Sequence, residues 1–336
     1  MVHKVNAYAA LEQGAKLTPF SYDMSPAVGD EIIMEVKYCG ICHSDTSMIN
    51  NEWGVSQYPL VAGHEVVGRV LEVGEQVKRL KTGEWVGLGF HSGYDLTCPQ
   101  CLSGDHNLCA AAEGTIMGRY GGFADKVKAR EAAIRQLPER MDYQSAGPLF
   151  CAGVTVFNPL LQFDTKPTDR VAVIGIGGLG HLALQFYSAW GCDVTAFTSP
   201  GPKQEEALQL GADHTLNSRD PEEIPKAASQ FDLVVSTVGA PLDWNQIVTT
   251  LKPKGRLHLL GVLTKPLDLD LQTIMTRQLE ISSSLVGSPS TLDKMIEFAC
   301  HHDIKPQIEI FPFEQINKAI ARMESGEARY RVVLEH

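Results

Sequence analysis

The sequence predicts an α/β fold with a doubly wound, six-stranded parallel sheet and a second, mainly β domain. After residue 142, apolar runs alternate with helical segments, as expected for parallel strands joined by crossover helices. One of these runs leads into a glycine-rich loop within residues 171–180. Before residue 140, short strands alternate with Gly, Pro and charged turns. The 336 residues are enough for two domains.

The first domain begins with a clear strand pattern at residues 31–38. Apolar side chains occupy every second position there, which predicts a half-buried strand that ends at residues 39–40. Further short strands with turns between them are predicted at 66–73, 85–89 and 123–127.

The second domain contains the strands of the parallel sheet, and the chain then returns to the first domain. The six strands are predicted at 170–174, 193–197, 213–216, 231–236, 256–260 and 279–285. The tail reads as helix 291–301, strand 307–311, helix 313–324 and strand 330–334. We therefore expect one domain at 1–146 with 286–336 and the other at 147–285.

The charge balance limits the expected partners. With 29 Lys+Arg against 40 Asp+Glu, the net charge is -11, so we expect neither nucleic acid nor a membrane as partner. Residues 171–192 are uncharged, but five glycines interrupt them, which favours a strand, a loop and a helix over a membrane span. We recognise no secretory signal at the N-terminus and expect a cytoplasmic protein.

The glycine-rich loop predicts a dinucleotide site. Gly175, Gly177 and Gly180 form a G-x-G-x-x-G motif, completed by Gly178 and Leu179. The first glycine allows the tight turn, the second lets the backbone approach a pyrophosphate, and the third lets the helix pack on the strand. The alternative is a plain glycine-rich α/β turn. A strand before the motif, a helix after it and five further strands favour the dinucleotide.

The end of the second parallel strand predicts the type of dinucleotide. NAD-binding proteins usually carry an acidic residue there, and this chain has none. It has Thr198 and Ser199, followed by Lys203, which together can hold a ribose 2'-phosphate without charge repulsion. We therefore expect NADP(H). The alternative is a solvated turn in which Lys203 only begins a helix.

Three separated residues predict a catalytic zinc site. The eight cysteines fall mostly in short-spaced groups, which favours metal binding over disulfides. Cys42, His64 and Cys151 can supply two thiolates and one imidazole, leaving one open position on the metal. From spacing alone, buried cysteines and a core histidine are the competing interpretation.

These motifs together resemble the medium-chain zinc-dependent alcohol dehydrogenases, especially their cinnamyl alcohol dehydrogenase-like branch and its bacterial aldehyde reductases. The resemblance covers the chain from the Cys42 motif, through the glycine loop, to the Arg329-Tyr330-Arg331 segment. It implies a GroES-like catalytic domain and a Rossmann domain. It also implies that Cys42, His64 and Cys151 bind the catalytic zinc.

The resemblance assigns roles to the neighbours of these ligands. Glu65 matches an acid that can approach the metal, and Asp45 matches the residue that orients the ligand histidine. Ser44 matches the hydroxyl beside the substrate oxygen, from which the proton passes toward solvent. Cys39 completes a C-x-x-C spacing, but the resemblance implies that it is a bystander.

Further residues are implied at the cofactor and in the proton relay. His43 and Thr155 are expected at the cofactor, and Arg331 is expected at its phosphates, with an ordinary strand-end cation as the alternative. Many relatives end the proton relay with a histidine where this chain has Ser47, so the last step is open. Apolar pocket walls are expected from Trp53 and from Ile49, Phe90, Met117 and Leu285, each of which could equally be ordinary core.

A second zinc site is expected in the segment 95–109. The family's lobe has four cysteines with two, two and seven residues between them, and here the first position is Asp95, followed by Cys98, Cys101 and Cys109. An aspartate oxygen can bind zinc, so we expect two Zn2+ per chain. His91 or His106 could replace the aspartate, or the lobe could bind no metal.

The expected reaction is hydride transfer between NADP(H) and a primary alcohol or aldehyde, aromatic or of medium chain length. A polyol or amino-alcohol dehydrogenase on the same fold is one alternative. A non-catalytic dinucleotide-binding protein is another. The resemblance also implies a homodimer or larger homo-oligomer.

Overall fold

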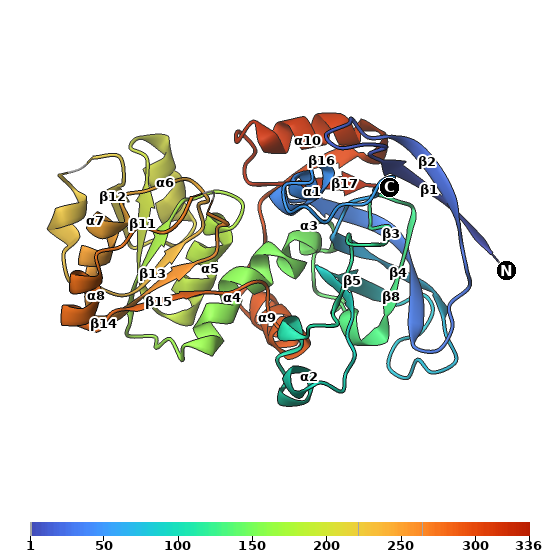
Figure 1. Ribbon diagram of the computed structural model, residues 1–336, viewed down its shortest axis with the longest axis horizontal. Helices are drawn as coiled ribbons and strands as arrows, with labels where there is room; N and C mark the ends of the chain where they lie inside the picture. Colours follow the sequence, from blue (N-terminus) through green and yellow to red (C-terminus); the bar gives the residue numbers. More distant parts are fainter. Residues whose placement is uncertain (1, 221, 264) are drawn as a thin grey trace. The chain divides into compact units, whose positions relative to one another are not determined.

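A computed structural model describes residues 2–220, 222–263 and 265–336 (Figure 1). The chain forms two compact units. The first comprises the chain up to Val154 together with Gly287–His336, and the second comprises Thr155–Val286. None of the helices in these ranges is both long and apolar enough to cross a membrane.

The second unit contains the predicted parallel sheet. Its six strands lie in the order β12-β11-β10-β13-β14-β15, and all of the pairings are parallel. The chain runs outward from β10 to β12 and then returns to β13, so the switch point lies between β10 and β13. The strands are β10 (Arg170–Ile174), β11 (Asp193–Thr198), β12 (His214–Asn217), β13 (Phe231–Ser236), β14 (Leu251–Leu259) and β15 (Glu280–Ser283).

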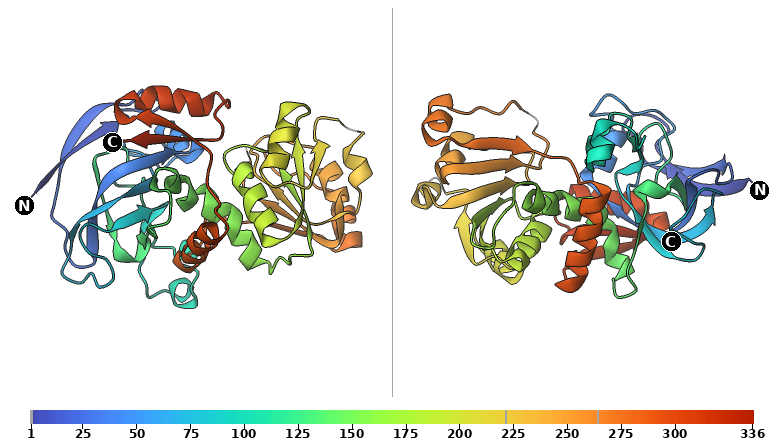
Figure 2. Two further views of the ribbon diagram at one scale, coloured as in Figure 1. Left: turned by 180° about the vertical axis from the view of Figure 1, so that it is seen from behind. Right: turned by 90° about the horizontal axis from the view of Figure 1, so that it is seen from below.

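Helices lie on both faces of this sheet (Figure 2). Trp244 and Val248 pack on the face formed by Ala172, Val234 and Leu257. Side chains begin two of the helices, since the N-cap aspartates of α7 and α8 accept backbone N–H groups. The helices are α4 (Ala152–Gln162), which crosses the unit boundary, α5 (Gly180–Trp190), α6 (Pro202–Gln209), η4 (Ile224–Ala227), α7 (Trp244–Thr249) and α8 (Leu271–Arg277).

The first unit is built on a seven-stranded sheet. Its order is β16-β17-β3-β4-β5-β9, with β8 also paired to β3. Two antiparallel two-stranded sheets, β1–β2 and β6–β7, complete it. The strands are β1 (His3–Ala9), β2 (Thr18–Met24), β3 (Glu31–Ile41), β4 (Glu65–Val73), β5 (Trp85–Leu88), β6 (His91–Gly93), β7 (Glu113–Gly114), β8 (Lys126–Arg130), β9 (Arg135–Gln136), β16 (Ile308–Pro312) and β17 (Arg331–Glu335).

The tail returns to this unit, as predicted. β17 pairs antiparallel with β3, so that Val332 lies opposite Ile41. The helices are short except for the two in the tail. They are α1 (His43–Ile49), α2 (Pro99–Ser103), η1 (His106–Leu108), η2 (Glu131–Ala133), α3 (Tyr143–Ala146), η3 (Gly147–Phe150), α9 (Pro289–His301), η5 (Phe313–Gln315) and α10 (Ile316–Glu324).

Three predicted strand bounds differ from the structure for identifiable reasons. β3 continues to Ile41 because β17 pairs with its last residues. The strand expected at 123–127 lies at 126–130, since Phe123 is bonded to Tyr8 and Ala62 outside the sheet. β14, expected at 256–260, begins at Leu251, because a register shift against β13 accommodates the Lys-Pro-Lys-Gly segment within the strand.

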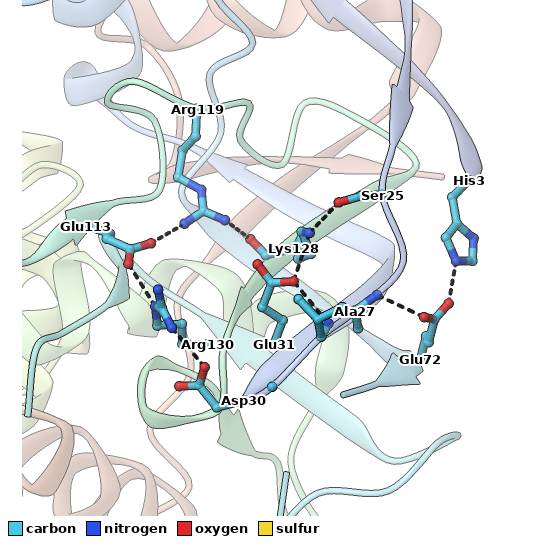
Figure 3. Close-up of polar contacts among 12 residues, drawn as sticks. His3, Ser25, Ala27, Asp30, Glu31, Glu72, Glu113, Arg119, Lys128 and Arg130 are labelled. Carbon is cyan, nitrogen blue, oxygen red and sulfur yellow. Dashed lines mark hydrogen bonds and ion pairs between the residues drawn. The ribbon is translucent and has the colours of Figure 1, made fainter. Parts of the chain in front are cut away.

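A chain of ion pairs joins the strand pair β6–β7 to the large sheet (Figure 3). Glu113 accepts hydrogen bonds from Arg119 and from Arg130, both at 2.8 Å, and Arg130 also pairs with Asp30 at 2.8 Å. Lys128, on β8, pairs with Glu31 on β3 at 2.9 Å. These contacts hold the loop after β7 against β8.

Candidate active site and metal centres

Four buried donor groups meet in the first unit. The donor atoms of Cys42, His64, Glu65 and Cys151 all lie within 4.8 Å of one another. Cys42 Sγ is 3.9 Å from Cys151 Sγ, and His64 Nε2 is 3.3 Å from the same sulfur. Thiolate and imidazole are the ligands that zinc prefers. The structure therefore brings together the three residues predicted to bind the catalytic zinc and Glu65, the acid that the resemblance implied could approach the metal.

Close backbone packing positions these donors. Gly63 has φ +94°, and a Cβ there would lie 2.6 Å from the backbone nitrogen of Phe123, so only glycine allows the turn into His64. A Cβ on Gly40 would lie 2.1 Å from Glu65 Oε2. Glycine in β3 thus leaves room for the carboxylate that β4 carries.

Asp45 contacts three parts of the site, and its predicted role in orienting the histidine stays a prediction. Its Oδ1 accepts hydrogen bonds from His64 Nδ1 at 2.9 Å and from the Gly63 backbone at 2.8 Å. Its Oδ2 accepts the Cys42 backbone N–H at 2.9 Å. Because the carboxylate can only accept, the imidazole proton lies on Nδ1, and Nε2 is left to bind a metal.

In the absence of a metal, Cys42 and Cys151 share one proton through a hydrogen bond between their sulfurs. The hydrogen bond from Cys151 holds the pKa of Cys42 well below its usual value, and the same bond raises the pKa of Cys151. One thiolate thus suppresses ionisation of the other. A dication between the sulfurs stabilises both thiolates, so this donor set fits zinc.

Arg331 lies at the buried carboxylate. Its guanidinium donates to Glu65 Oε1 and, at 3.1 Å, to the Ile41 carbonyl, and the residue is only 4% exposed. Burial raises the pKa of Glu65, and Arg331 opposes this. Glu65 Oε2 is buried without a hydrogen-bond partner among the described residues. We expected Arg331 at the cofactor phosphates; that role stays a prediction, whereas its pairing with Glu65 is a feature that the sequence did not indicate.

The hydroxyl and aromatic residues expected near the substrate lie on α1, in the loop after it and between β5 and β6. Ser44 Oγ lies 3.8 Å from Cys42 Sγ. The ring of Phe90 packs 5.6 Å from that of His64, and Trp53 packs 6.4 Å from Phe90. Trp53 and Phe90 thus form a continuous aromatic surface that reaches the candidate metal ligand.

Cys39, which was expected to be a bystander, is buried and lies outside both donor clusters of the described residues. Ser47 donates to Glu52 Oε2 at 2.6 Å, a pairing that the sequence analysis missed. His43 is exposed at the start of α1, and Leu285, at 58% exposure, belongs to the second unit.

A second donor cluster contains Asp95, Cys98, Cys101 and Cys109. One oxygen or sulfur of each lies within 4.8 Å of the others. Asp95 Oδ1 accepts the backbone N–H groups of Thr97 at 2.8 Å and Cys98 at 2.9 Å. These bonds, that of Cys98 first, lower the pKa of Asp95 and keep it an anion. The donor set fits a closed zinc site with one oxygen ligand.

The two histidines considered as substitutes do not join this cluster. Within the described part of the chain, neither His91 nor His106 belongs to the set of donors. Their rings pack instead on Tyr94, at 5.5 Å and 5.4 Å. Of the candidates for the non-cysteine position, Asp95 is the one placed to bind the metal.

The glycine loop in the second unit fits a pyrophosphate. Gly175 has φ +86°, and a Cβ on Gly180 would lie 1.9 Å from the Gly175 carbonyl oxygen, so both glycines are required by packing. A Cβ on Gly177 would meet nothing within 4 Å, which leaves space over the loop for a ligand. Thr237 donates to the Gly175 carbonyl at 2.7 Å and fixes the loop, a contact the sequence analysis missed.

The residues expected to read the ribose lie where β11 ends. Thr198 is the last residue of β11, Ser199 follows it, and Lys203 lies in the first turn of α6. Gly178 and Leu179 complete the loop before α5, and Thr155 is buried on α4. The cofactor contacts of these residues remain predictions.

Known proteins match this chain over nearly its whole length. The alcohol dehydrogenase GroES-like domain matches residues 29–139, and the zinc-binding dehydrogenase domain matches residues 178–300. An aldehyde reductase of Synechocystis sp. is 57% identical, over 99% of each chain. A solved cinnamyl alcohol dehydrogenase of Sorghum bicolor is 34% identical with a TM-score of 0.94, over 99% of this chain and 98% of the other.

A second solved structure is that of the cinnamyl alcohol dehydrogenase of Helicobacter pylori, complexed with NADP(H). It is 25% identical with a TM-score of 0.91, over 100% of this chain and 99% of the other. Sequence identity, full coverage and the two donor clusters thus point the same way. The chain belongs to the medium-chain zinc-dependent alcohol dehydrogenases, in their cinnamyl alcohol dehydrogenase-like branch.

Proposed function

We propose that this protein is an NADPH-dependent zinc aldehyde reductase, and that it oxidises the corresponding primary alcohols in the reverse direction. The observation that carries this proposal is the buried cluster of Cys42, His64 and Cys151, with Asp45 bonded to His64 Nδ1. Zinc held there polarises a carbonyl and favours loss of the alcohol proton. The relatives named above act on aldehydes and alcohols of this kind, which supports the proposal.

The protein's own residues hold the metal in a nearly neutral environment. Two thiolates, from Cys42 and Cys151, balance a dication, and Arg331 balances Glu65. Since charges are costly to bury unless they are paired, this balance favours a stable site in a buried position. Asp45 keeps the His64 ring in the tautomer and orientation needed for binding.

Ser44 is the hydroxyl that gives or takes the proton of the substrate oxygen. It lies next to the metal ligands, with Oγ 3.8 Å from Cys42 Sγ, and a hydroxyl can donate one proton while accepting another. It acts as a relay and needs a further group to exchange the proton with solvent.

NADPH is the proposed hydride donor. Thr198 and Ser199 offer hydroxyls at the end of β11, and Lys203 offers a cation in the first turn of α6. A carboxylate at this place would repel a 2'-phosphate, and the chain has none. The NADP(H) complex of the Helicobacter pylori relative supports this choice.

Aromatic and medium-chain aldehydes are the proposed substrates. Phe90 packs its apolar ring against His64, and Trp53 packs against Phe90, which favours contact with an apolar substrate over a polyol. The second cluster, with Asp95, is proposed to bind a structural zinc that crosslinks the loop 95–109.

The test is a panel assay on the zinc-loaded protein. At fixed enzyme concentration, oxidation of NADPH is followed with benzaldehyde, cinnamaldehyde, hexanal and acetaldehyde. Reduction of NADP+ is followed separately with mannitol. We expect the aromatic and medium-chain aldehydes to give the highest kcat/KM. Faster turnover of mannitol would favour a polyol dehydrogenase, and no turnover with any substrate at full zinc occupancy would support a non-catalytic binding protein.

A further inference from the structure

A buried histidine on β14 holds the edge strand of the parallel sheet at two points. His258 is fully buried, and its Nδ1 and Nε2 lie 2.9 Å and 3.0 Å from the hydroxyls of Ser282 and Ser284. His258 pairs in register with Ser282 of β15, and Ser284 lies two positions further, on the same face. One imidazole thus contacts both serines.

The ring of His258 is neutral and shielded from water. Burial, and then the charge of Arg256, lowers the pKa of His258 to about 4. A neutral imidazole has one N–H donor and one acceptor nitrogen, so it donates to one hydroxyl and accepts from the other. The ring also packs edge to face on Phe163, with the centroids 4.9 Å apart. A ring without solvent exposure is not placed to exchange protons, so its effect on a reaction is through position.

Ser284 lies just past the end of β15 and is held there by the histidine. The pairing between β14 and β15 ends with Leu259 beside Ser283. Ser283 donates to the Leu259 carbonyl at 2.8 Å, so β15 is tied to β14 at this point without His258. The contact of Ser284 with His258 extends the attachment beyond the last paired position.

The backbone after Ser284 is strained. Val286, two residues further, is buried and has φ +48°, a region that β-branched residues rarely adopt. Such a conformation persists where the surrounding structure fixes it, and it is frequent at ligand-binding and catalytic sites. His258 therefore holds the start of a segment whose conformation the fold maintains at an energetic cost.

This segment belongs to the half of the sheet that suits the nicotinamide end of a dinucleotide. In a doubly wound sheet each half takes one nucleotide at the carboxyl ends of its strands. The proposed contacts of the glycine loop and of Thr198 place the adenosine end on β10–β12, which leaves β13–β15 for the nicotinamide end. The two halves are closely packed there, since a Cβ on Gly175 would lie 2.2 Å from Val238 Cγ1 and one on Gly261 would lie 2.3 Å from the Val238 backbone.

We propose that His258 is a positioning residue for hydride transfer: through Ser284 it fixes the carboxyl end of β15, beside which the nicotinamide end of NADP(H) binds. This inference rests on the proposed function. Hydride transfer needs reacting atoms that are aligned and about 3–3.5 Å apart, and an error of about 1 Å can slow a reaction about a hundredfold. Because His258 is fully buried, it acts through Ser284 and not by touching the cofactor.

The experiment follows one turnover of the zinc-loaded protein. Protein that carries one NADPH per site is mixed with excess benzaldehyde in a stopped-flow instrument, below the melting temperature of every variant. The loss of NADPH absorbance gives the rate, and NADPH deuterated at the transferred position shows that hydride transfer is the step observed. The dissociation constants of NADPH and of 2',5'-ADP, which lacks the nicotinamide end, are measured on the same preparations.

Four variants separate positioning from stability. Ser284→Ala is the decisive one, because it removes the contact with His258 and leaves the pairing of β15 intact. His258→Phe removes both serine contacts and keeps a ring, and Ser284→Thr retains the hydroxyl. Ser283→Ala is the matched control, since it removes a hydroxyl bond between β15 and β14 that does not involve His258.

We expect Ser284→Ala and His258→Phe to slow hydride transfer by about tenfold or more, with unchanged zinc content and 2',5'-ADP affinity. Ser284→Thr and Ser283→Ala should match the unmodified protein. Unchanged hydride transfer in Ser284→Ala would overturn the inference. Equal slowing by Ser283→Ala would also overturn it, because the attachment of β15 as a whole would then set the geometry. If the unmodified protein reduces no aldehyde, whatever its affinity for 2',5'-ADP, the proposed function is wrong and the inference fails with it.

Discussion

At the scale of single residues, Asp45 determines the geometry of the candidate catalytic zinc site. It bonds to the ring of His64, to the Gly63 backbone and to the Cys42 backbone, and it is fully buried. One side chain thus orients two metal ligands that lie 22 positions apart in the chain. Its role could be predicted from the family pattern. The contact with the Gly63 backbone depends on how α1 meets the segment before β4, whereas the contact with the Cys42 backbone is local to the first turn of α1.

Asp45→Asn tests this role. The amide keeps the shape of the carboxylate but can place a donor against His64 Nδ1, so the tautomer that binds zinc is disfavoured. We expect zinc affinity and kcat to fall by about ten- to a hundredfold. Zinc affinity is measured by competition with a chelator. Unchanged affinity, with the fold intact by circular dichroism, would contradict the role assigned to Asp45.

Ser236 gives a second prediction at this scale. Its hydroxyl is fully buried at the end of β13 and has no hydrogen-bond partner among the described residues. An unpaired buried hydroxyl destabilises the folded state, so Ser236→Ala should raise the free energy of unfolding by about 1 kcal/mol. Thr250→Val removes a hydroxyl that donates to the Ile247 carbonyl at 2.7 Å, so this change should lower the free energy of unfolding. Urea unfolding compares the two; a destabilised Ser236→Ala would show that the hydroxyl has a partner.

At the scale of elements, the parallel strands were predicted best. β10 and β13 occur at the predicted residues because each contains an uninterrupted apolar stretch, 171–174 and 233–235. The two-stranded sheets β1–β2 and β6–β7 were not predicted. β6 and β7 are too short to show a period, and β2 exposes most of its residues. Partners that depend on tertiary geometry, such as Thr237 for Gly175, leave no local pattern in the sequence.

The end of β11 gives a prediction about the cofactor. We expect kcat/KM with NADPH to exceed that with NADH by about tenfold or more, the effect of one charged contact. Thr198→Asp places a carboxylate near the 2'-phosphate and should erode or reverse this preference. Thr168→Asp adds the same charge before β10, at the amino-terminal ends of the strands, and should leave the cofactor preference unchanged. Equal kcat/KM values for the two cofactors in the unmodified enzyme would refute the assignment.

The loop 95–109 gives a prediction about the second metal. Asp95→Ala removes both the oxygen ligand and the acceptor for the Thr97 and Cys98 backbone N–H groups. We expect the variant to lose this zinc more easily to a chelator and to melt at a lower temperature, while the catalytic zinc stays bound. Asp105→Ala, in the same lobe but outside the cluster, is the control. Equal zinc retention by the two variants would exclude Asp95 as a ligand.

At the scale of the whole molecule, the chain separates metal binding from dinucleotide binding. Both donor clusters belong to the first unit, and the glycine loop belongs to the second. The sequence predicted a separate dinucleotide domain, but its predicted boundary at residue 147 placed Cys151 in that domain, whereas the first unit of the structure extends to Val154 and includes this donor. It did not predict that Arg331 is buried against Glu65, since the partner of a tail residue depends on β17 pairing with β3.

The central claim is that the reduction of aldehydes by NADPH requires a zinc ion held by Cys42, His64 and Cys151. Cys151→Ser tests it most directly, because it replaces one soft ligand by a poorer one at the same position. Zinc content, far-ultraviolet circular dichroism and NADPH oxidation with the best aldehyde of the panel are measured on one preparation. We predict a folded protein that retains one zinc per chain in place of two and has no measurable activity. Turnover near that of the unmodified protein would contradict the claim.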